Sequence, residues 1–570
     1  MRATNMKREI SNTRLPLALM AALLLTVAAY AAAPGITGPA FHLTAQQAFL
    51  NQPDGAAVYS WGYGCNGAPA GFAPTMPNQN CPTMQVPGPT MIVTEGQTVT
   101  VTLTNNLPTS AGNTSILFPG FNVTATGGVT GLLTQEAAPG GTVTYSFPTT
   151  GLPGTHPYYS GTQGDLQIEM GLYGAVVVLP SSVPANCTTG LAASNLTAEG
   201  YWGETDWRLA KSAYDHPGSC YDREYLFQWA EMDVNIHRQA LAQVSATVGC
   251  TAGAPGCSLN VPTEPYHPAY FVINGRSMPD LMDPNYDPIY PHQPYNGNPH
   301  MHPGELTLVR SIGQGRWQHP FHEHGNHVRI LARDGNMVLA SPTVAPITYG
   351  TVGGSTASGP PLAGILMFNT DTTPGQAFDG IFYWSGRGLN WDPYGHNPSS
   401  ADPLAKLPCT PDANGYNTGA PTAINYFEWC QDHNKPLEAN PFGDVNSGGP
   451  ATLPNPNIFT NGPWYGGTPY LGPDATIRSS ATLRNDAHSG MSGCETGTTI
   501  KTAPAGTNPT PNCTNLQPSN IQANPPNERG FAFMWHSHNE REITTNNVFP
   551  GGMLMMMLVD SREFVIDESQ

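Results

Sequence analysis

The chain of 570 residues has little charge and little sign of helix. Asp, Glu, Lys and Arg make up 11% of it, and they form no block of one sign. The best amphipathic helical pattern is short, at residues 234–244. Glycine and proline are abundant, with 62 and 57 residues. These features favour β-sandwiches joined by long loops over helical bundles, and the length predicts two or three domains.

Motifs of several other protein classes are also missing. The sequence has no G-x-S-x-G elbow for a nucleophilic serine and no glycine loop for phosphate. None of its cysteines forms a C-x-x-C pair. Its net charge of −18 repels nucleic acid and offers no polybasic patch for anionic lipid. We therefore expect no nucleic-acid partner.

The N-terminal residues 1–33 have the layout of a secretory signal peptide. Four basic residues precede an apolar run over residues 15–29, and A-x-A cleavage patterns follow it. An uncleaved membrane anchor is the alternative, although the run is short for a span. Removal of residues 1–31 deletes the four basic residues and Glu9, so the net charge falls from −18 to −21. We expect a secreted protein, extracellular or periplasmic, with no membrane contact after cleavage.

The ten cysteines are expected to form disulfides, because an exported chain with an even number normally pairs them. Sequence does not fix the connectivity, but neighbouring cysteines close the shortest loops at the lowest entropic cost. The predicted pairs are Cys65–Cys81, Cys187–Cys220, Cys250–Cys257, Cys409–Cys430 and Cys494–Cys513.

Short β-branched runs between turn signals predict strands along most of the chain; TVTVTL at residues 98–103 is an example. Three blocks follow from their distribution: domain one at 38–182, domain two at 220–398 and a C-terminal segment at 440–570. We expect the last block to form a third, shortened sandwich; the alternative is that it completes the second. Region 484–528 resembles a long disulfide-tied loop.

Two groups of histidines are candidates for a metal site. The first is His319-Pro320-Phe321-His322-Glu323-His324-Gly325-Asn326-His327, and the second is Trp535-His536-Ser537-His538. Side chains alternate between the faces of a strand, so each H-x-H pair points one way. Two adjacent strands would then present four imidazoles to one ion, which suits copper or zinc. Metal-free, hydrogen-bonded histidines are the alternative.

These motifs resemble those of the multicopper oxidases, the laccase-like family. The likeness includes H-P-x-H-x-H-G with the following Arg333-Asp334-Gly335, the C-terminal H-x-H with Gly552-Met553, and Gly171-Leu172-Tyr173-Gly174. It covers most of residues 85–560, with 400–520 poorly matched. The resemblance implies an all-β fold of tandem cupredoxin-like Greek-key β-sandwiches with long loops. It also implies a type 1 copper that takes electrons from substrate and a three-copper cluster that reduces dioxygen.

The sequence departs from the family at several ligand positions. The first H-x-H-G falls on Leu117-Phe118-Pro119-Gly120, and the second pair falls on Tyr159-Ser160-Gly161. The C-terminal H-C-H reads His536-Ser537-His538, and Glu542 stands where another histidine is expected. A type 1 site requires a thiolate, which a serine hydroxyl does not replace. We therefore expect a degenerate member with no blue copper.

Of the histidines that the resemblance assigns to the three-copper cluster, four are present: His322, His324, His536 and His538. Four imidazoles suit one ion rather than three. Weaker candidates are His319, His327 and Met553. The resulting hypothesis is a secreted copper-binding protein, with zinc as the other metal considered, that has at most limited oxidoreductase activity. The competing hypothesis is a non-catalytic structural or binding protein on the same scaffold. The sequence identifies no reducing substrate, and it leaves open self-assembly or a partner at the surface.

Three further features receive a simpler interpretation. His300 and His302 lie in a proline-rich loop and match no ligand position of the family, so we expect them to be solvated. The methionine-rich run at 553–559 is expected to be a buried strand, because methionine packs irregular cores well. Glu540 and Glu542 are expected to be surface carboxylates.

Overall fold

The structure is a computed structural model, and it describes residues 33–76, 78–188, 206–350, 355–384, 408–413, 415–419, 428–430, 468–470, 530–560 and 566. Nearly all of its regular structure is β. In these residues the α-helices are α2 (Gly164–Gln167) and α4 (Val234–Ala246), and the 3-10 turns are η1 (Thr109–Ala111), η2 (Ala185–Thr188) and η3 (Asp280–Met282). The predicted all-β fold class is confirmed.

The first sandwich has two five-stranded sheets. One runs in the order β11 (Gly154–Tyr159), β12 (Tyr173–Leu179), β5 (Met91–Thr94), β1 (Gly35–Thr37), β4 (Phe72–Ala73). The other runs β3 (Ala57–Cys65), β2 (Ala40–Asn51), β6 (Thr98–Asn105), β10 (Thr142–Pro148), β7 (Thr124–Thr126). A separate hairpin joins β8 (Val129–Thr130) to β9 (Gln135–Glu136). Valines and leucine of β6 alternate inward with outward threonines, as the TVTVTL pattern predicts.

The second sandwich also has two sheets. The first follows the order β14 (Tyr270–Ile273), β13 (Arg223–Met232), β16 (Leu306–Gly313), β24 (Ala377–Tyr383), β18 (Val328–Arg333), β19 (Asn336–Met337), with β22 (Leu366–Met367) beside β18. The other follows β15 (His300–Met301), β27 (Leu554–Asp560), β26 (Gly530–Ser537), β17 (His319–Glu323), β23 (Asn369–Thr372), with β25 (Thr468–Tyr470) beside β26. A detached pair contains β20 (Ile347–Gly350) and β21 (Thr356–Gly359). Trp229, Phe321, Phe382 and Trp535 belong to one buried cluster that includes strands of both sheets.

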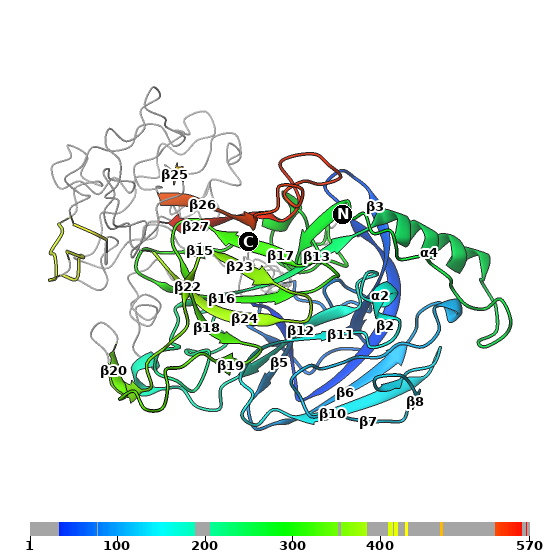
Figure 1. Ribbon diagram of the computed structural model, residues 1–570, viewed down its shortest axis with the longest axis horizontal. Helices are drawn as coiled ribbons and strands as arrows, with labels where there is room; N and C mark the ends of the chain where they lie inside the picture. Colours follow the sequence, from blue (N-terminus) through cyan, green and yellow to red (C-terminus); the bar gives the residue numbers. More distant parts are fainter. Residues whose placement is uncertain are drawn as a thin grey trace, which may run out of the picture.

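The described C-terminal strands belong to the second sandwich. In Figure 1, β26 and β27 lie beside β15 and β17, and β26 pairs with β17 while β27 pairs with β15. This placement matches the alternative in which the C-terminal segment completes the second sandwich, and differs from the favoured third sandwich. Most of residues 440–529 lies outside the described part, so the domain boundaries stay predictions.

Strand β27 has the buried alternation expected of the methionine-rich run. Met555, Met557 and Val559 are fully buried in the sandwich core. The helix predicted at 234–244 is also present, as α4. Its first turn is capped by the side chain of Asp233, which accepts a hydrogen bond from Asn235 N–H. Among the described residues, no helix is long and apolar enough to cross a membrane.

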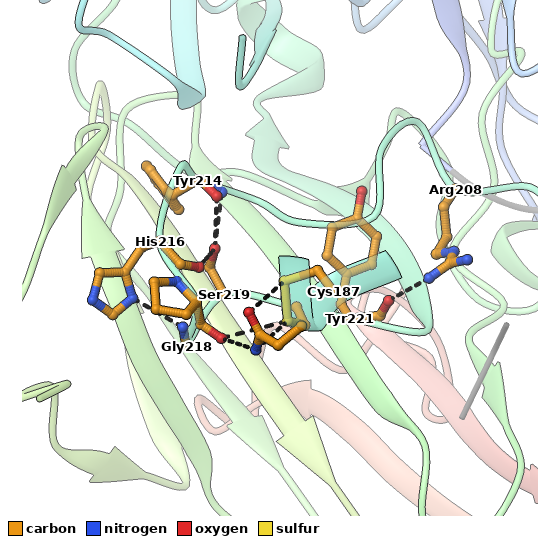
Figure 2. Close-up of a disulfide and its surroundings, with 10 residues drawn as sticks. Cys187, Arg208, Tyr214, His216, Gly218, Ser219 and Tyr221 are labelled. Atoms are coloured by element: carbon orange, nitrogen blue, oxygen red, sulfur yellow. Dashed lines mark hydrogen bonds between the residues drawn. A yellow bond between two sulfur atoms is a disulfide. The ribbon is translucent and has the colours of Figure 1, made fainter. Parts of the chain in front are cut away.

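Four of the five predicted disulfides are present: Cys65–Cys81, Cys187–Cys220, Cys250–Cys257 and Cys409–Cys430. The fifth, Cys494–Cys513, lies outside the described residues and stays a prediction. Figure 2 shows Cys187 beside the loop 212–220 that carries Tyr214 and Ser219. Ser219 Oγ donates within this loop, 2.9 Å from the carbonyl oxygen of Tyr214. The disulfide thus anchors the loop that carries Tyr214.

A buried charged network joins the two sandwiches. Arg310 on β16 donates to Glu224 on β13 at 2.9 Å and lies 3.6 Å from Asp379 on β24. Asp379 in turn accepts from Thr155 Oγ1 of the first sandwich at 2.6 Å, and from Tyr214 at 2.5 Å. All these groups are buried. An unpaired charge at this depth is costly, so the network fixes how the sandwiches dock.

Replacing Arg310 by leucine should strongly destabilise the fold, because Glu224 and Asp379 would remain buried without their cation. We expect Arg310→Leu to lower the free energy of unfolding by about 3–5 kcal/mol, measured by urea denaturation. The matched control is Arg238→Leu on the exposed side of α4, which should change it by less than about 0.5 kcal/mol. Equal effects of the two substitutions would contradict the proposed role of the network.

Candidate metal centre

The pairing of β17 with β26 brings the two histidine groups together. In this antiparallel pair His322 lies opposite His536, and Phe321 lies opposite Ser537. The strands are separated by more than two hundred residues of sequence, so the juxtaposition depends wholly on tertiary structure. Because His322 and His536 are register partners, their side chains emerge on the same face of the sheet.

The four imidazole rings lie close to one another. The ring centroid of His322 is 4.7 Å from that of His324, 5.3 Å from that of His536 and 4.8 Å from that of His538. The centroids of His324 and His536 are 5.3 Å apart, and those of His536 and His538 are 5.7 Å apart. These separations are within the reach expected of rings grouped around one ion.

Three of the histidines form a tight group of ligand atoms. His322, His324 and His536 each offer one ring nitrogen, and these nitrogens all lie within 4.8 Å of one another. The Nε2 atoms of His324 and His536 are 3.3 Å apart. Two nitrogens bound tetrahedrally at the metal–imidazole distance of about 2.0–2.1 Å would be about 3.3 Å apart. This part of the group therefore already has the spacing that a shared ion requires.

Hydrogen bonds orient two of these rings with Nε2 towards the group. His322 Nδ1 lies 2.5 Å from the carbonyl oxygen of Phe368, and His536 Nδ1 lies 2.6 Å from that of Ser537. A carbonyl only accepts, so each Nδ1 is the donor and each neutral ring keeps its Nε2 lone pair. Metal-binding histidines commonly donate their second ring N–H to a carbonyl in this way.

Burial keeps these imidazoles neutral. It lowers the pKa of His322 to about 4, with the neighbouring imidazole of His324 adding to the effect. Burial also lowers the pKa of His536. The neutral ring is the form that binds a metal ion, so at neutral pH no proton has to leave these two side chains first.

His538 lies at the solvent-exposed edge of the group. Its side chain is exposed, whereas those of His322 and His536 are buried and that of His324 is half-buried. Its backbone N–H donates to the carbonyl of Pro320 at 2.8 Å, which ties it to β17. His538 therefore adjoins the three tighter histidines without sharing their mutual spacing.

The residues treated as weaker candidates lie elsewhere. Both ring nitrogens of His319 are bonded to carboxylates, as described below. His327 is half-buried beside Phe368, with ring centroids 5.1 Å apart. Met553 is fully buried in the hydrophobic core.

His300 and His302 correct a sequence-based expectation, because both are buried rather than solvated. His300 begins the two-residue strand β15, which pairs with β27. Its backbone carbonyl accepts from Tyr225 OH at 2.7 Å, and its N–H donates to the same hydroxyl at 2.9 Å. This part of the loop is buried because β15 pairs with β27, a strand far away in the sequence.

A buried network that the sequence did not reveal lies on the other face of β17 and β26. His319 Nδ1 is 2.8 Å from Glu542 Oε2, and His319 Nε2 is 2.9 Å from Glu231 Oε2. All three side chains are at most 1% exposed, so Glu542 is not the surface carboxylate that we expected. We call Glu231, His319 and Glu542 the Glu–His–Glu network.

His319 is an imidazolium in this network, since both of its nitrogens face carboxylate oxygens. Burial alone would lower its pKa, but the hydrogen bonds to Glu231 and Glu542 outweigh it and raise the pKa of His319 to about 9. Ser537 Oγ also donates to Glu542 Oε2, at the position where the family resemblance places a cysteine.

The first-sandwich residues at which the sequence resemblance places family motifs carry apolar or uncharged side chains. Leu117 and Tyr159 pair through their backbones, with N···O distances of 2.8 and 3.3 Å. Phe118 is buried among Tyr145, Phe147 and Tyr158. Leu117 and Tyr159 are half-buried, and none of these residues supplies an imidazole.

Comparison with known proteins gives a partial family match. Residues 80–183, within the first sandwich, match the family model described as multicopper oxidase. No curated protein matches the chain.

Three solved structures resemble it weakly. The multicopper oxidase mgLAC is 17% identical, with 60% of this chain and 74% of that chain covered and a TM-score of 0.33. The blue copper oxidase from Nitrosomonas europaea is 18% identical, with 60% of this chain and 74% of that chain covered and a TM-score of 0.34. The copper nitrite reductase from Nitrosomonas europaea is 18% identical, with 61% of this chain and 85% of that chain covered and a TM-score of 0.33. Similarity at this level does not extend to function.

The raised pKa of His319 predicts a pH-dependent stability. Its ordinary pKa is 6.5 and its folded value is about 9, so protonation stabilises the folded state fully below about pH 6.5, and this contribution is lost as the pH rises towards 9. The contribution is on the order of 3 kcal/mol. The melting temperature should therefore fall between pH 6.5 and 9, measured by circular dichroism at constant ionic strength.

The variant His319→Gln provides the control for that measurement. The variant should be less stable than the parent at pH 6.5. Its melting temperature should also fall much less than that of the parent between pH 6.5 and 9, because glutamine does not titrate. If the melting temperatures of the parent and the variant fall in parallel across this pH range, His319 is not the group that causes the pH dependence.

Proposed function

We propose that this chain is a secreted, multicopper-oxidase-like protein that binds one copper ion through His322, His324, His536 and His538. The observation that carries the proposal is the three-histidine group with ring nitrogens within 4.8 Å of one another. His538, whose ring centroid lies 4.8 Å from that of His322, is proposed as the fourth ligand at the exposed edge. The partial match to the multicopper oxidase family supports copper as the ion.

The donor set fits copper or zinc better than a harder cation. Neutral imidazole suits both of these ions, whereas magnesium and calcium prefer oxygen ligands. We favour copper on the family match and treat zinc as the competing ion. Copper, when bound, would supply one-electron redox chemistry. The role of the chain is to hold neutral imidazoles at fixed spacing, with Phe368 and Ser537 carbonyls setting the tautomers of His322 and His536.

We propose at most limited oxidoreductase activity and not that of a complete four-copper oxidase. Ser537 provides no thiolate, and its hydroxyl is engaged with Glu542. His319 is held between two carboxylates. Leu117 and Tyr159 occupy first-sandwich positions where the family resemblance predicts histidines. Each of these positions would have to supply a metal ligand in a complete enzyme.

Secretion is part of the same proposal. Disulfides are typical of oxidising compartments, and four are present. The signal-like residues 1–33 support export to the periplasm or the cell exterior.

A non-catalytic scaffold is the second candidate function, and one observation favours it. The Nε2 atoms of His324 and His536 can share a hydrogen bond at their 3.3 Å separation. Burial lowers the pKa of His322 and His536, so a metal-free group would carry little repulsion. Metal analysis of the purified protein separates the two functions.

Removing one histidine from each strand should abolish stoichiometric metal binding. The double variant His322→Asn, His536→Asn leaves only His324 and His538, too few ligands to compete for an ion. We expect the parent to bind about one copper per chain and the variant none, measured by equilibrium dialysis and metal analysis. The control His42→Asn, His267→Asn removes two exposed histidines and should bind like the parent. Copper bound equally by both double variants would exclude the proposed site.

The copper-loaded parent should show no intense blue absorption, because a serine hydroxyl gives no thiolate charge transfer. Restoring the thiol alone, as Ser537→Cys, should not create laccase activity. His319 would still be bonded to Glu231 and Glu542, and the first-sandwich positions would be unchanged. Oxidation of a phenolic substrate and the visible spectrum test this. Turnover by Ser537→Cys at a laccase-like rate would refute the degenerate assignment.

A further inference from the structure

The Glu–His–Glu network lies directly behind the candidate metal centre. On β17, His319 and Phe321 point to one side and His322 to the other, since successive residues of a strand alternate. Ser537, the register partner of Phe321, shares the side of His319. The network therefore occupies one face of β17 and β26, while His322 and His536 occupy the opposite face.

The network connects three separate segments of the second sandwich. Glu231 on β13 accepts hydrogen bonds from the backbone N–H groups of Arg316 and Trp317, at 2.7 and 2.9 Å, and so fixes the chain that enters β17. His319, on β17 itself, links Glu231 to Glu542. One buried charged group thus ties the strand carrying His322 to the opposite sheet.

Glu542 acts on the other histidine-bearing segment. Its Oε2 accepts from Ser537 Oγ, between His536 and His538 in sequence. Its Oε1 accepts from Asn539 Nδ2 at 2.9 Å, the residue that follows His538. Its backbone N–H also donates to the carbonyl of Asn539 at 2.8 Å. Glu542 therefore holds both ends of the short stretch that bears His538.

We propose that Glu231, His319 and Glu542 are positioning residues that hold the two histidine-bearing segments in register and set the placement of His536 and His538 for metal binding. This inference rests on the proposed copper site. It adds a function for residues other than the four proposed ligands, and it assigns Ser537 as the link between Glu542 and the ligand pair on either side of it.

Charge and burial make the network suited to this role. An imidazolium between two carboxylates forms charge-assisted hydrogen bonds, which are about twice as strong as neutral ones. Removing one member leaves an uncompensated buried charge, so the surrounding turn must rearrange. A shift of β26 by one residue against β17 would turn His536 to the wrong face. Bonds on the back face oppose such a shift without using any metal ligand.

The experiment compares Glu542→Gln with the parent. Glutamine has nearly the same shape but offers one oxygen acceptor, and it cannot serve His319, Ser537 and Asn539 together. We expect its affinity for Cu(II), measured by chelator competition, to fall about tenfold or more, as is typical when groups supporting metal ligands are altered. The Cu(II) electron paramagnetic resonance spectrum should also change, because His536 and His538 would be placed differently.

Two further variants make the result specific. Glu540→Gln removes the same charge from the same turn at an exposed position, and it should keep the affinity within about twofold and the parent spectrum. Ser537→Ala leaves the His319–Glu542 pair intact and removes the hydroxyl that donates to Glu542 and accepts from the backbone N–H of Asn539. It should therefore fold like the parent and still shift the spectrum. If Glu542→Gln does not fold, Ser537→Ala tests the positioning role by itself.

The outcomes distinguish this inference from the proposed function. A folded Glu542→Gln or Ser537→Ala protein with parental affinity and spectrum, changed only in melting temperature, would overturn the positioning role alone. A parent that binds no copper would overturn the proposed function and this inference together. Loss of affinity in Glu540→Gln to the same degree would show that charge, rather than the hydrogen-bonded placement, is responsible.

Discussion

The antiparallel pairing of β17 with β26 is the constraint on which the candidate site depends. It places His322 opposite His536 and Phe321 opposite Ser537, so one register generates both a cluster of imidazoles on one face and a buried charged network on the other. Sheet register is strongly specified where one face is buried. Here the buried face carries Trp535 and Phe321 in the hydrophobic core as well as His319, so apolar packing and charge pairing favour the same register.

Local patterns in the sequence were enough to predict much of this fold. The alternation at residues 98–103, the helix at 234–244 and the buried methionine strand depend on neighbours within a few residues, so periodicity reveals them. Four disulfides were predictable because short loops close at low entropic cost. The grouping of His322, His324 and His536 followed from the alternation within H-x-H motifs together with the family resemblance.

Features that depend on distant partners were not predictable from local pattern. Glu542 follows a strand end and resembles a surface residue in sequence, yet it is buried and bonded to His319 on the neighbouring strand β17, 223 residues away in the chain. The strand β15 has two residues and no periodic signal, yet His300 is buried where β15 pairs with β27 and where Tyr225 bonds the backbone of His300. In both cases a long-range contact, absent from the local sequence, decides burial.

The two faces of the strand pair also complement one another electrostatically. Four neutral imidazoles leave the charge of a bound divalent ion uncompensated, and a partly buried cation in such a shell is favoured by nearby negative charge. Behind the strands, one imidazolium stands between two carboxylates that also face other donors. These donors are Ser537 and Asn539 at Glu542, and the backbone N–H groups of Arg316 and Trp317 at Glu231. The hydrogen bonds to both carboxylates outweigh the effect of burial and hold His319 as an imidazolium, with its pKa raised to about 9. The network thus places carboxylate oxygens behind the imidazoles, on the face of the strands opposite His322 and His536, where they supply no ligand to an ion.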